Sequence, residues 1–182
     1  MDNILVTGGT GFIGSHTVVE LLNAGYNVVV LDNLVNSSKE SLERIKKITG
    51  KSVKFYEDDL LDMEALQNIF EKENISSVIH FAGLKAVGES CQIPLAYFNN
   101  NITGTINLVM AMEKYNVKSL VFSSSATVYG KPESVPIRED FPLSVSNPYG
   151  RTKLIIEDML RDIYKADKSW DIALLRYFNP IG

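Results

Sequence analysis

The stretch Thr7-Gly8-Gly9-Thr10-Gly11-Phe12-Ile13-Gly14 decides the fold that this sequence predicts. It follows the apolar run Ile4-Leu5-Val6 and leads into a segment, 13–24, with the apolar spacing of a helix. Its glycines fit GxGxxG when read from Gly9 and GxxGxxG when read from Gly8. Because glycine has no Cβ, such a turn is tight and lets backbone N–H groups at the helix N-terminus approach a phosphate. The stretch therefore predicts a phosphate-binding turn between a strand and a helix.

Short β-branched runs alternate with longer helical segments through the rest of the chain. The expected strands are 4–6, 27–31, 53–56, 77–80, 119–123 and 172–176, and the expected helices are 13–24, 39–48, 63–72, 95–115 and 149–165. Nearly continuous apolar strands that alternate with helices predict an α/β protein, a doubly wound parallel-sheet Rossmann fold with three α/β/α layers. The proline-rich segment 130–148 is expected to form an irregular loop over the site.

Composition and charge exclude several classes of function. The chain has 182 residues, of which 45% are hydrophobic and 22% charged, as in ordinary soluble globular domains, so one domain over 1–182 is expected. A net charge of −4 opposes a nucleic-acid partner or an anionic membrane surface. No apolar run is long enough to cross a bilayer, and we expect no secretory signal at the start of the chain. Cys91 is the single cysteine, which excludes an internal disulfide and two-cysteine metal motifs. We expect a cytoplasmic protein without a metal, with secretion as the alternative.

Two acidic residues follow expected strands and bear on the choice of cofactor. Asp32 directly follows the strand 27–31, where its carboxylate can accept hydrogen bonds from an adenosine ribose and would repel a 2′-phosphate. NAD is therefore favoured over NADP. The alternative is a glycine turn that serves packing alone, with Asp32 solvated. Asp59, with Leu60, follows the third strand where this fold can hold an adenine, although Asp59 is equally typical of a turn.

A tyrosine and a lysine at the start of the helix 149–165 are candidates for proton transfer. The spacing of Tyr149 and Lys153 puts both side chains on one helical face. A tyrosine with its ordinary pKa of about 10 is a weak base at neutral pH, but a nearby ammonium and the positive nicotinamide of NAD would lower that pKa. The run Ser123-Ser-Ser-Ala-Thr127 at the end of the fifth strand supplies a hydroxyl beside them. Alone, each feature is more typical of packing or capping. Together with the glycine turn they form the active-site set of the short-chain dehydrogenases.

Three longer blocks make the resemblance more specific. They are His80-Phe-Ala-Gly-Leu-Lys-Ala-Val-Gly-Glu-Ser90, Ser123-Ser-Ser-Ala-Thr-Val-Tyr-Gly130 and Ala173-Leu-Leu-Arg-Tyr-Phe-Asn-Pro180. Across the whole chain the sequence resembles the UDP-glucose 4-epimerase family. The resemblance implies an NAD-dependent isomerase of galactose metabolism that interconverts UDP-glucose and UDP-galactose through a transient 4-keto intermediate, with NAD held throughout.

The resemblance also implies residue roles. Tyr149 takes the proton of the sugar 4-hydroxyl, Lys153 tunes Tyr149 and holds the nicotinamide ribose, and Ser125 matches the catalytic hydroxyl of the family. The implied cofactor-binding residues are Gly8, Gly11, Phe12, Ile13, Gly14, Asp32, Asn33, Leu34, Val35, Asn36, Ser37, Asp59, Leu60, Phe81, Ala82, Gly83, Leu84, Lys85, Asn100, Tyr149, Lys153, Tyr177 and Phe178. The implied substrate-binding residues are Lys85, Ser125, Tyr149 and Asn179. Without the resemblance, Phe81 and Phe178 would be core aromatics and Asn100 a helix cap.

The positions after the catalytic hydroxyl discriminate among relatives. Nucleotide-sugar dehydratases resemble this scaffold but carry an acidic pair there, and the related decarboxylases also use an acid. This chain has Ala126 and Thr127, which cannot do acid–base work at that point. Both alternatives are disfavoured. Acceptance of N-acetylated sugars, as in a UDP-N-acetylglucosamine 4-epimerase, stays open.

The family's chain continues for roughly as long again after Gly182, and that portion carries most of the sugar pocket. Two interpretations follow: a truncated NAD-binding half of an epimerase, or a free-standing, non-catalytic NAD-binding module. We expect the 182 residues to bind NAD without epimerising UDP-galactose at a useful rate. We also expect exposed apolar surface near the C-terminus to promote self-association. The full-length family members are typically homodimers, for which 95–115 and 149–165 could supply helices.

Overall fold

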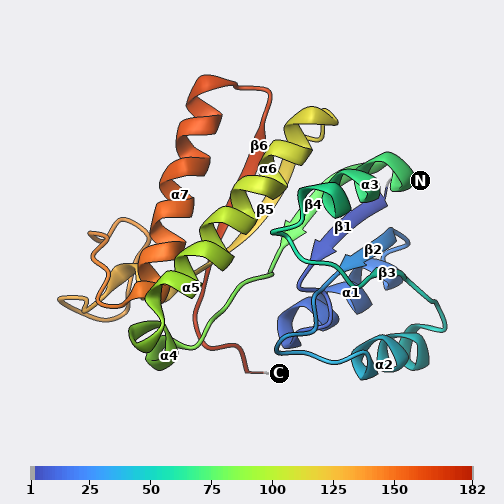
Figure 1. The fold of residues 1–182 in the computed structure, drawn as a ribbon. Helices are drawn as coiled ribbons and strands as arrows, with labels where there is room; N and C mark the ends of the chain where they lie inside the picture. Colours follow the sequence, from blue (N-terminus) through green and yellow to red (C-terminus); the bar gives the residue numbers. More distant parts are fainter. Residues whose placement is uncertain (1–2, 182) are drawn as a thin grey trace.

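The computed structural model describes residues 3–181 and arranges them around one six-stranded parallel sheet (Figure 1). The strands are β1 (Asn3–Thr7), β2 (Asn27–Leu31), β3 (Lys54–Tyr56), β4 (Ile75–His80), β5 (Ser119–Ser125) and β6 (Asp171–Tyr177). Their order is β3-β2-β1-β4-β5-β6, and every neighbouring pair is parallel. The expected doubly wound α/β fold is confirmed. The strands up to β3 are added on one side of β1 and those from β4 onward on its other side. Such folds bind ligands at this switch point, between β1 and β4.

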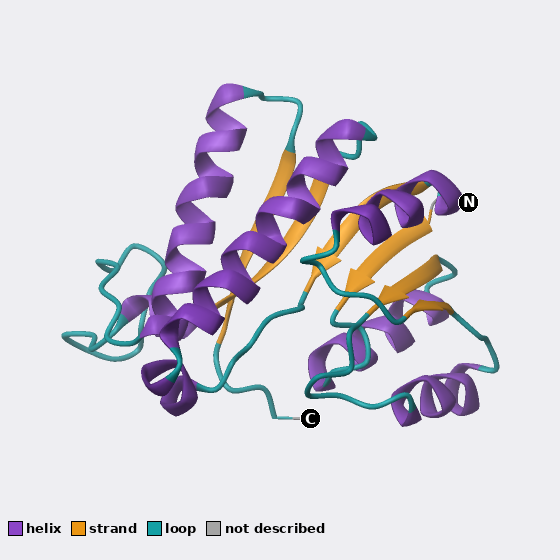
Figure 2. Ribbon diagram, viewed as in Figure 1, coloured by secondary structure: helices purple, strands orange, loops and turns teal. Residues whose placement is uncertain are grey.

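Seven α-helices of the described residues connect the strands (Figure 2). They are α1 (Phe12–Asn23), α2 (Glu40–Thr49), α3 (Met63–Glu73), α4 (Val87–Gln92), α5 (Pro94–Phe98), α6 (Gly104–Lys114) and α7 (Pro148–Ala166). A π-helical segment, Asn99–Thr103, joins α5 to α6, and a 3-10 helix, Ala126–Tyr129, follows β5. The expected single helix over 95–115 is therefore wrong in detail, because the π-helical segment interrupts it. The sequence pattern also missed α4.

The two faces of the sheet carry separate apolar cores. Successive strand residues point to opposite faces, so Leu5, Val29 and Val78 pack under α3, α6 and α7. Ile4 and Val30 pack on the other face against α1 and α2. The strands are buried on both sides where both layers are present, which is why they consist of almost unbroken apolar residues.

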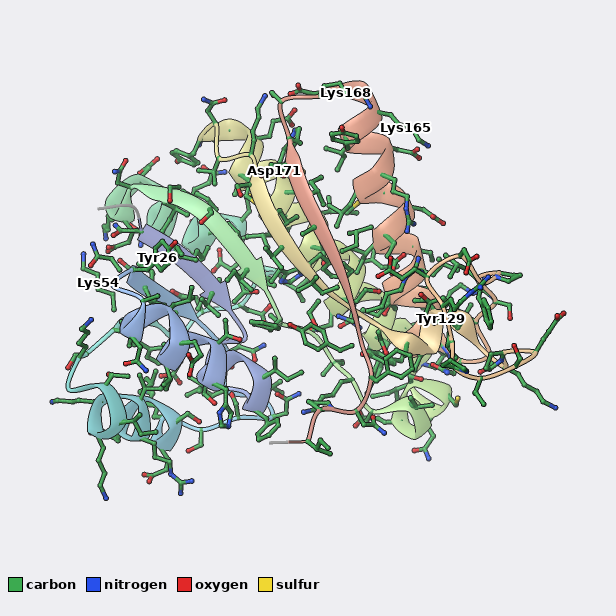
Figure 3. All side chains as sticks on the ribbon, turned by 180° about the vertical axis from the view of Figure 1, so that it is seen from behind. Tyr26, Lys54, Tyr129, Lys165, Lys168 and Asp171 are labelled. Atoms are coloured by element: carbon green, nitrogen blue, oxygen red, sulfur yellow. The ribbon has the colours of Figure 1, made fainter. Side chains whose placement is uncertain are left out.

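The second face is covered unequally. Helices α1 and α2 lie over β1, β2 and β3, whereas β6 crosses the opposite half of that face (Figure 3). Within residues 3–181 no helix lies over β6 there, and Leu175 is 42% exposed. Alternate residues of β6 are exposed while their neighbours contact α7. The sheet is therefore three-layered over its first half and two-layered at its β6 edge.

The segment 130–147 contains no helix or strand, as expected, but it does not lie over the site. No residue from Gly130 to Pro148 lines the main cavity. Instead Ile137 and Glu139 line a separate hollow with Tyr129 and residues of β6. Its expected place over the site is wrong, because the chain turns outward past the carboxyl end of β5 rather than back across the sheet.

Candidate functional site

A cavity of about 390 Å³ opens at the carboxyl ends of the strands. The predicted site residues that line it are Gly8, Gly11, Phe12, Ile13, Gly14, Asp32, Asn33, Val35, Asn36, Asp59, Leu60, Phe81, Ala82, Gly83, Leu84, Lys85, Asn100, Ser125, Tyr149, Lys153, Tyr177, Phe178 and Asn179. Leu34 and Ser37, predicted with them, are not part of its wall. The wall residues that the sequence did not predict are Leu31, Asp58, Val87 and Pro180, and the expected serine-rich run contributes Ser123, Ser124 and Thr127 besides Ser125.

The glycine turn has the shape that close backbone approach requires. Gly8 has a φ of +69°, and a Cβ there would lie 2.6 Å from the backbone nitrogen of Ala82. A Cβ on Gly14 would overlap the Gly8 carbonyl oxygen and lie 2.9 Å from the Cα of Gly9. Helix α1 begins after Gly11 without a side-chain cap, so its first-turn N–H groups face the cavity wall as donors for an anion. This cradle fits the pyrophosphate of a dinucleotide.

Asp32 is held firmly at the end of β2. Its carboxylate accepts hydrogen bonds from the Thr10 backbone N–H (3.1 Å), the Leu34 backbone N–H (3.0 Å) and the Ser37 hydroxyl (2.8 Å). Leu34 and Ser37 therefore contact Asp32 instead of the cavity. The side chain of Asp32 is fixed in place before any ribose arrives, and its charge lies in the cavity wall.

Asp59 is both a turn residue and a wall residue. Its Oδ1 accepts from the Leu61 backbone N–H at 2.9 Å, and its Oδ2 accepts from the Asn33 amide at 2.8 Å. The amide of Asn107, on α6, donates to the Leu60 carbonyl at 3.0 Å. The loop after β3 is thereby tied to the loop after β2 and to α6. The two interpretations of Asp59 from the sequence are compatible.

The buried amide of Asn101 holds the loop 81–85 against α7. Its Oδ1 accepts from the Leu84 backbone N–H (2.8 Å), and its Nδ2 donates to the Leu84 carbonyl (3.0 Å) and to the Thr152 hydroxyl (3.0 Å). A Cβ on Gly83, whose φ is +154°, would lie 3.1 Å from the Asn101 Oδ1. Sequence reasoning missed Asn101. The run of three asparagines, 99–101, within an apolar helical pattern was the available signal.

Tyr149 and Lys153 lie on the first turns of α7, which Asn147 caps. Lys153 is 5% exposed, and its Nζ donates to the carbonyl of Ser123 at 2.8 Å. The same Nζ is 4.8 Å from the ring centroid of Phe122 and 6.0 Å from that of Tyr149. Burial lowers the pKa of Lys153 to about 8. The amine is thus close enough to neutral pH to respond to a change in its surroundings.

The pKa of Tyr149 is not lowered in the protein by itself. Burial raises it above the ordinary value, and the hydrogen bond of Ser125 offsets this only partly. The expected lowering of this pKa included the effect of the positive nicotinamide of NAD; in the protein alone, burial dominates and the pKa is raised. Further positive charge at the cavity is needed to favour the phenolate.

The three serines at the end of β5 differ in what they contact. Ser123 offers its carbonyl to Lys153, and the Ser124 hydroxyl donates to Glu157 at 2.5 Å on the α7 face. Ser125 caps the 3-10 helix and acts on Tyr149. Both Ser124 and Ser125 line the cavity, but the Ser124 hydroxyl is committed to Glu157, whereas Ser125, the predicted catalytic serine, acts on Tyr149.

Glu157, which sequence reasoning missed, is fully buried one helical turn after Lys153. Its carboxylate accepts from Arg176 (3.0 and 2.8 Å), from Arg161 (2.7 Å) and from Ser124. Burial acts to raise the pKa of Glu157, but these hydrogen bonds outweigh it and the pKa is lowered. The only signal in the sequence was its spacing from Lys153.

In the ranges between Asn3 and Ile181, no group of three or more His, Cys, Asp and Glu residues is placed to hold a metal ion. None of the helices described there is both long and apolar enough to cross a membrane.

A parallel sheet with a glycine turn, a strand-end acid and a Ser/Tyr/Lys set defines a class of nucleotide-dependent enzyme domains. The chain belongs to the NAD dependent epimerase/dehydratase family, whose family model matches residues 4–182. It is 66% identical over 179 residues to the UDP-glucose 4-epimerase of Bacillus subtilis (strain 168), a match that covers 98% of this chain and 53% of that protein. The chain spans about half the length of the curated relatives it matches.

Solved structures of 4-epimerases have the same fold as this chain. The UDP-glucose 4-epimerase from Bifidobacterium longum, in complex with NAD+ and UDP, has a TM-score of 0.97 at 54% identity and covers 99% of this chain and 54% of its own. The UDP-Glc/GlcNAc 4-epimerase from Campylobacter jejuni has a TM-score of 0.93 at 40% identity and covers 98% and 54%. The resemblance to the UDP-glucose 4-epimerases is confirmed.

Proposed function

We propose that this chain forms the NAD-binding and proton-transferring half of an enzyme that interconverts UDP-glucose and UDP-galactose at C4. The observation that carries the proposal is that Ser125, Tyr149 and Lys153 line the same cavity as the glycine turn and Asp32. The similarity to a relative solved with NAD+ and UDP supports the choice of both ligands. Asp32 favours NAD over NADP because a 2′-phosphate beside its carboxylate is repelled.

Each residue of the set has a distinct task in this proposal. NAD, when bound, supplies the acceptor and donor of a hydride at the sugar C4. Tyr149 removes and returns the proton of the 4-hydroxyl, Ser125 donates a hydrogen bond at that oxygen, and Lys153 contributes positive charge. Lys85 and Asn179, at the open rim, would hold the sugar nucleotide.

The wider assignments are proposals of the same kind. We infer a single Rossmann domain over 1–182, a role in galactose metabolism, a cytoplasmic location and a homodimer in the whole protein. The relatives' names support the sugar nucleotide, and the exposed apolar residues of α6 and α7 supply a helix face for a dimer. A non-catalytic NAD-binding module is the alternative.

The first experiment quantifies the nucleotide that copurifies with the 182-residue chain and measures epimerase turnover in the same sample. We expect bound NAD rather than NADP, and little turnover. Phe178 is 57% exposed, so the sugar side of the cavity is open to water that a hydride-transferring site must exclude. Purified protein that binds neither nucleotide, or prefers NADP, would contradict the proposal. Robust turnover would show that this half suffices.

The name of one relative supports assaying an N-acetylated sugar nucleotide as a second substrate. The Campylobacter jejuni relative is named for both UDP-glucose and UDP-N-acetylglucosamine. UDP-galactose and UDP-N-acetylgalactosamine should each be tested for reduction of bound NAD, with Tyr149→Phe as the control. Reduction that persists in Tyr149→Phe would remove Tyr149 from the mechanism.

A further inference from the structure

Thr127 is a cavity residue that the mechanism above does not use. Its hydroxyl donates to the Ser125 Oγ at 3.0 Å, and its backbone N–H donates to the same oxygen at 3.2 Å. Resting on the proposed function, we propose that Thr127 is a positioning residue that directs the Ser125 proton toward Tyr149 and the reacting oxygen.

The hydrogen-bonding capacity of the Ser125 hydroxyl limits what it can do. A serine hydroxyl has one O–H donor and two acceptor lone pairs. Thr127 fills both acceptor positions of Ser125, one with its side chain and one with its backbone. The remaining capacity of Ser125 is to donate, and donation is what a phenolate or developing alkoxide at Tyr149 requires. Thr127 itself neither gains nor loses a proton.

The position of Thr127 is fixed from the side of α7. A Cβ on Gly150 would lie 3.2 Å from the Thr127 carbonyl oxygen and 3.3 Å from its Oγ1. The residue is therefore wedged between Ser125 and the turn that carries Tyr149. Removal of its methyl would leave the hydroxyl there, whereas removal of its hydroxyl would free one Ser125 lone pair.

The other groups around Tyr149 do not replace this hydrogen bond. The Nζ of Lys153 is 6.0 Å from the Tyr149 ring centroid, and Ser90 accepts from the Tyr149 backbone N–H rather than donating to the phenol. The Tyr97 hydroxyl donates to Glu89 at 2.6 Å, so it does not donate to the Tyr149 phenol. Among the described residues, the hydrogen bond of Ser125 alone acts to lower the pKa of Tyr149.

The test uses the 182-residue chain with tyrosine labelled at 13Cζ, whose chemical shift reports hydrogen bonds to the phenol oxygen. The Tyr149 resonance is assigned with Tyr149→Phe, and spectra are recorded at neutral pH with and without NAD. Thr127→Val, which keeps the shape and removes the hydroxyl, should reproduce most of the change that Ser125→Ala produces. Thr127→Ser should restore the wild-type shift.

Thr17→Val is the matched control, because the Thr17 hydroxyl donates only to the Ile13 carbonyl of its own helix. It should leave the Tyr149 resonance unchanged. The proposal is overturned if Thr127→Val lowers thermal stability but leaves the Tyr149 shift at its wild-type value, since Thr127 would then be a helix-capping partner only. It is also overturned if Thr127→Ser behaves as Thr127→Val. The spectra without NAD decide this even if NAD binding, and with it the proposed function, fails.

Discussion

At the scale of single residues, Glu157 joins the elements that carry the site. Its carboxylate links α7 to β5 through Ser124 and to β6 through Arg176. Arg176 in turn donates to the Tyr129 hydroxyl at 2.7 Å. The helix with Tyr149 and Lys153 is thereby fixed to two strand ends by one buried charge. Replacing both partners of a buried ion pair by apolar residues often changes stability little, but removing one partner leaves the other charge buried and uncompensated.

Glu157→Gln should reduce the free energy of unfolding at neutral pH by about 3–5 kcal/mol, because Arg176 loses its counter-charge in a buried place. The lowered pKa of Glu157 gives the pH dependence: its stabilisation is present above 4.5, the ordinary value, and is lost as pH falls through the folded-state value. Urea denaturation at several pH values should show the gap between variant and wild type closing in acid.

The matched control at this scale is Glu40→Gln. Glu40 pairs with Arg44 at 3.1 Å, but both side chains are exposed, at 61% and 73%. Its change should stay within about 0.5 kcal/mol, as for surface pairs in helices. Equal effects of the two substitutions would refute the assignment of Glu157 as a buried anchor.

At the scale of elements, the turn between β1 and α1 depends on the absence of side chains. Gly14 packs on the backbone of the turn before it, and Gly8 on the loop after β4. The phosphate cradle is therefore built from backbone groups at contact distance. Any added carbon has to displace the turn or the helix.

Gly14→Ala should lower stability by about 1–3 kcal/mol, as overpacking does, and should abolish measurable NAD binding by calorimetry. Gly88→Ala is the control, because a Cβ on Gly88, in α4, meets nothing within 4 Å. That variant should bind NAD normally and gain about 0.5–1 kcal/mol, the usual benefit of alanine within a helix. Normal NAD binding by Gly14→Ala would count against the cradle.

At the scale of the whole molecule, apolar surface is distributed unequally. Leu175 on β6 is 42% exposed on the side of the sheet that α1 and α2 leave open, and Phe178, directly after β6, is 57% exposed. Met110, 55% exposed, lies on α6 on the opposite face. Exposed apolar groups that lie together favour association. Substitutions on the open sheet face and on the helix face distinguish which of them mediates self-association.

Sedimentation velocity over a range of concentrations should show self-association of the 182-residue chain. Leu175→Lys should shift the protein toward monomer, because a charge on the open sheet face opposes its burial. Met110→Lys tests the helix face and should have the smaller effect. A concentration-independent monomer without binding of an apolar dye would refute the prediction, and a larger effect of Met110→Lys would transfer the interface to the helices.

The sequence by itself determined the features that depend on local pattern. Strand and helix alternation, the glycine turn, Asp32 and the Tyr149–Lys153 spacing are readable because periodicity and φ preference act between near neighbours. The role of Asn101 was not readable, because within the π-helical segment its amide binds the backbone of Leu84, seventeen positions earlier in the chain. The contacts of Ser124 with Glu157, and of Leu34 and Ser37 with Asp32, likewise required the strands and loops to be assembled. Tertiary structure alone decided how burial sets the pKa values of Tyr149 and Lys153, since desolvation depends on every neighbour in space rather than on sequence spacing.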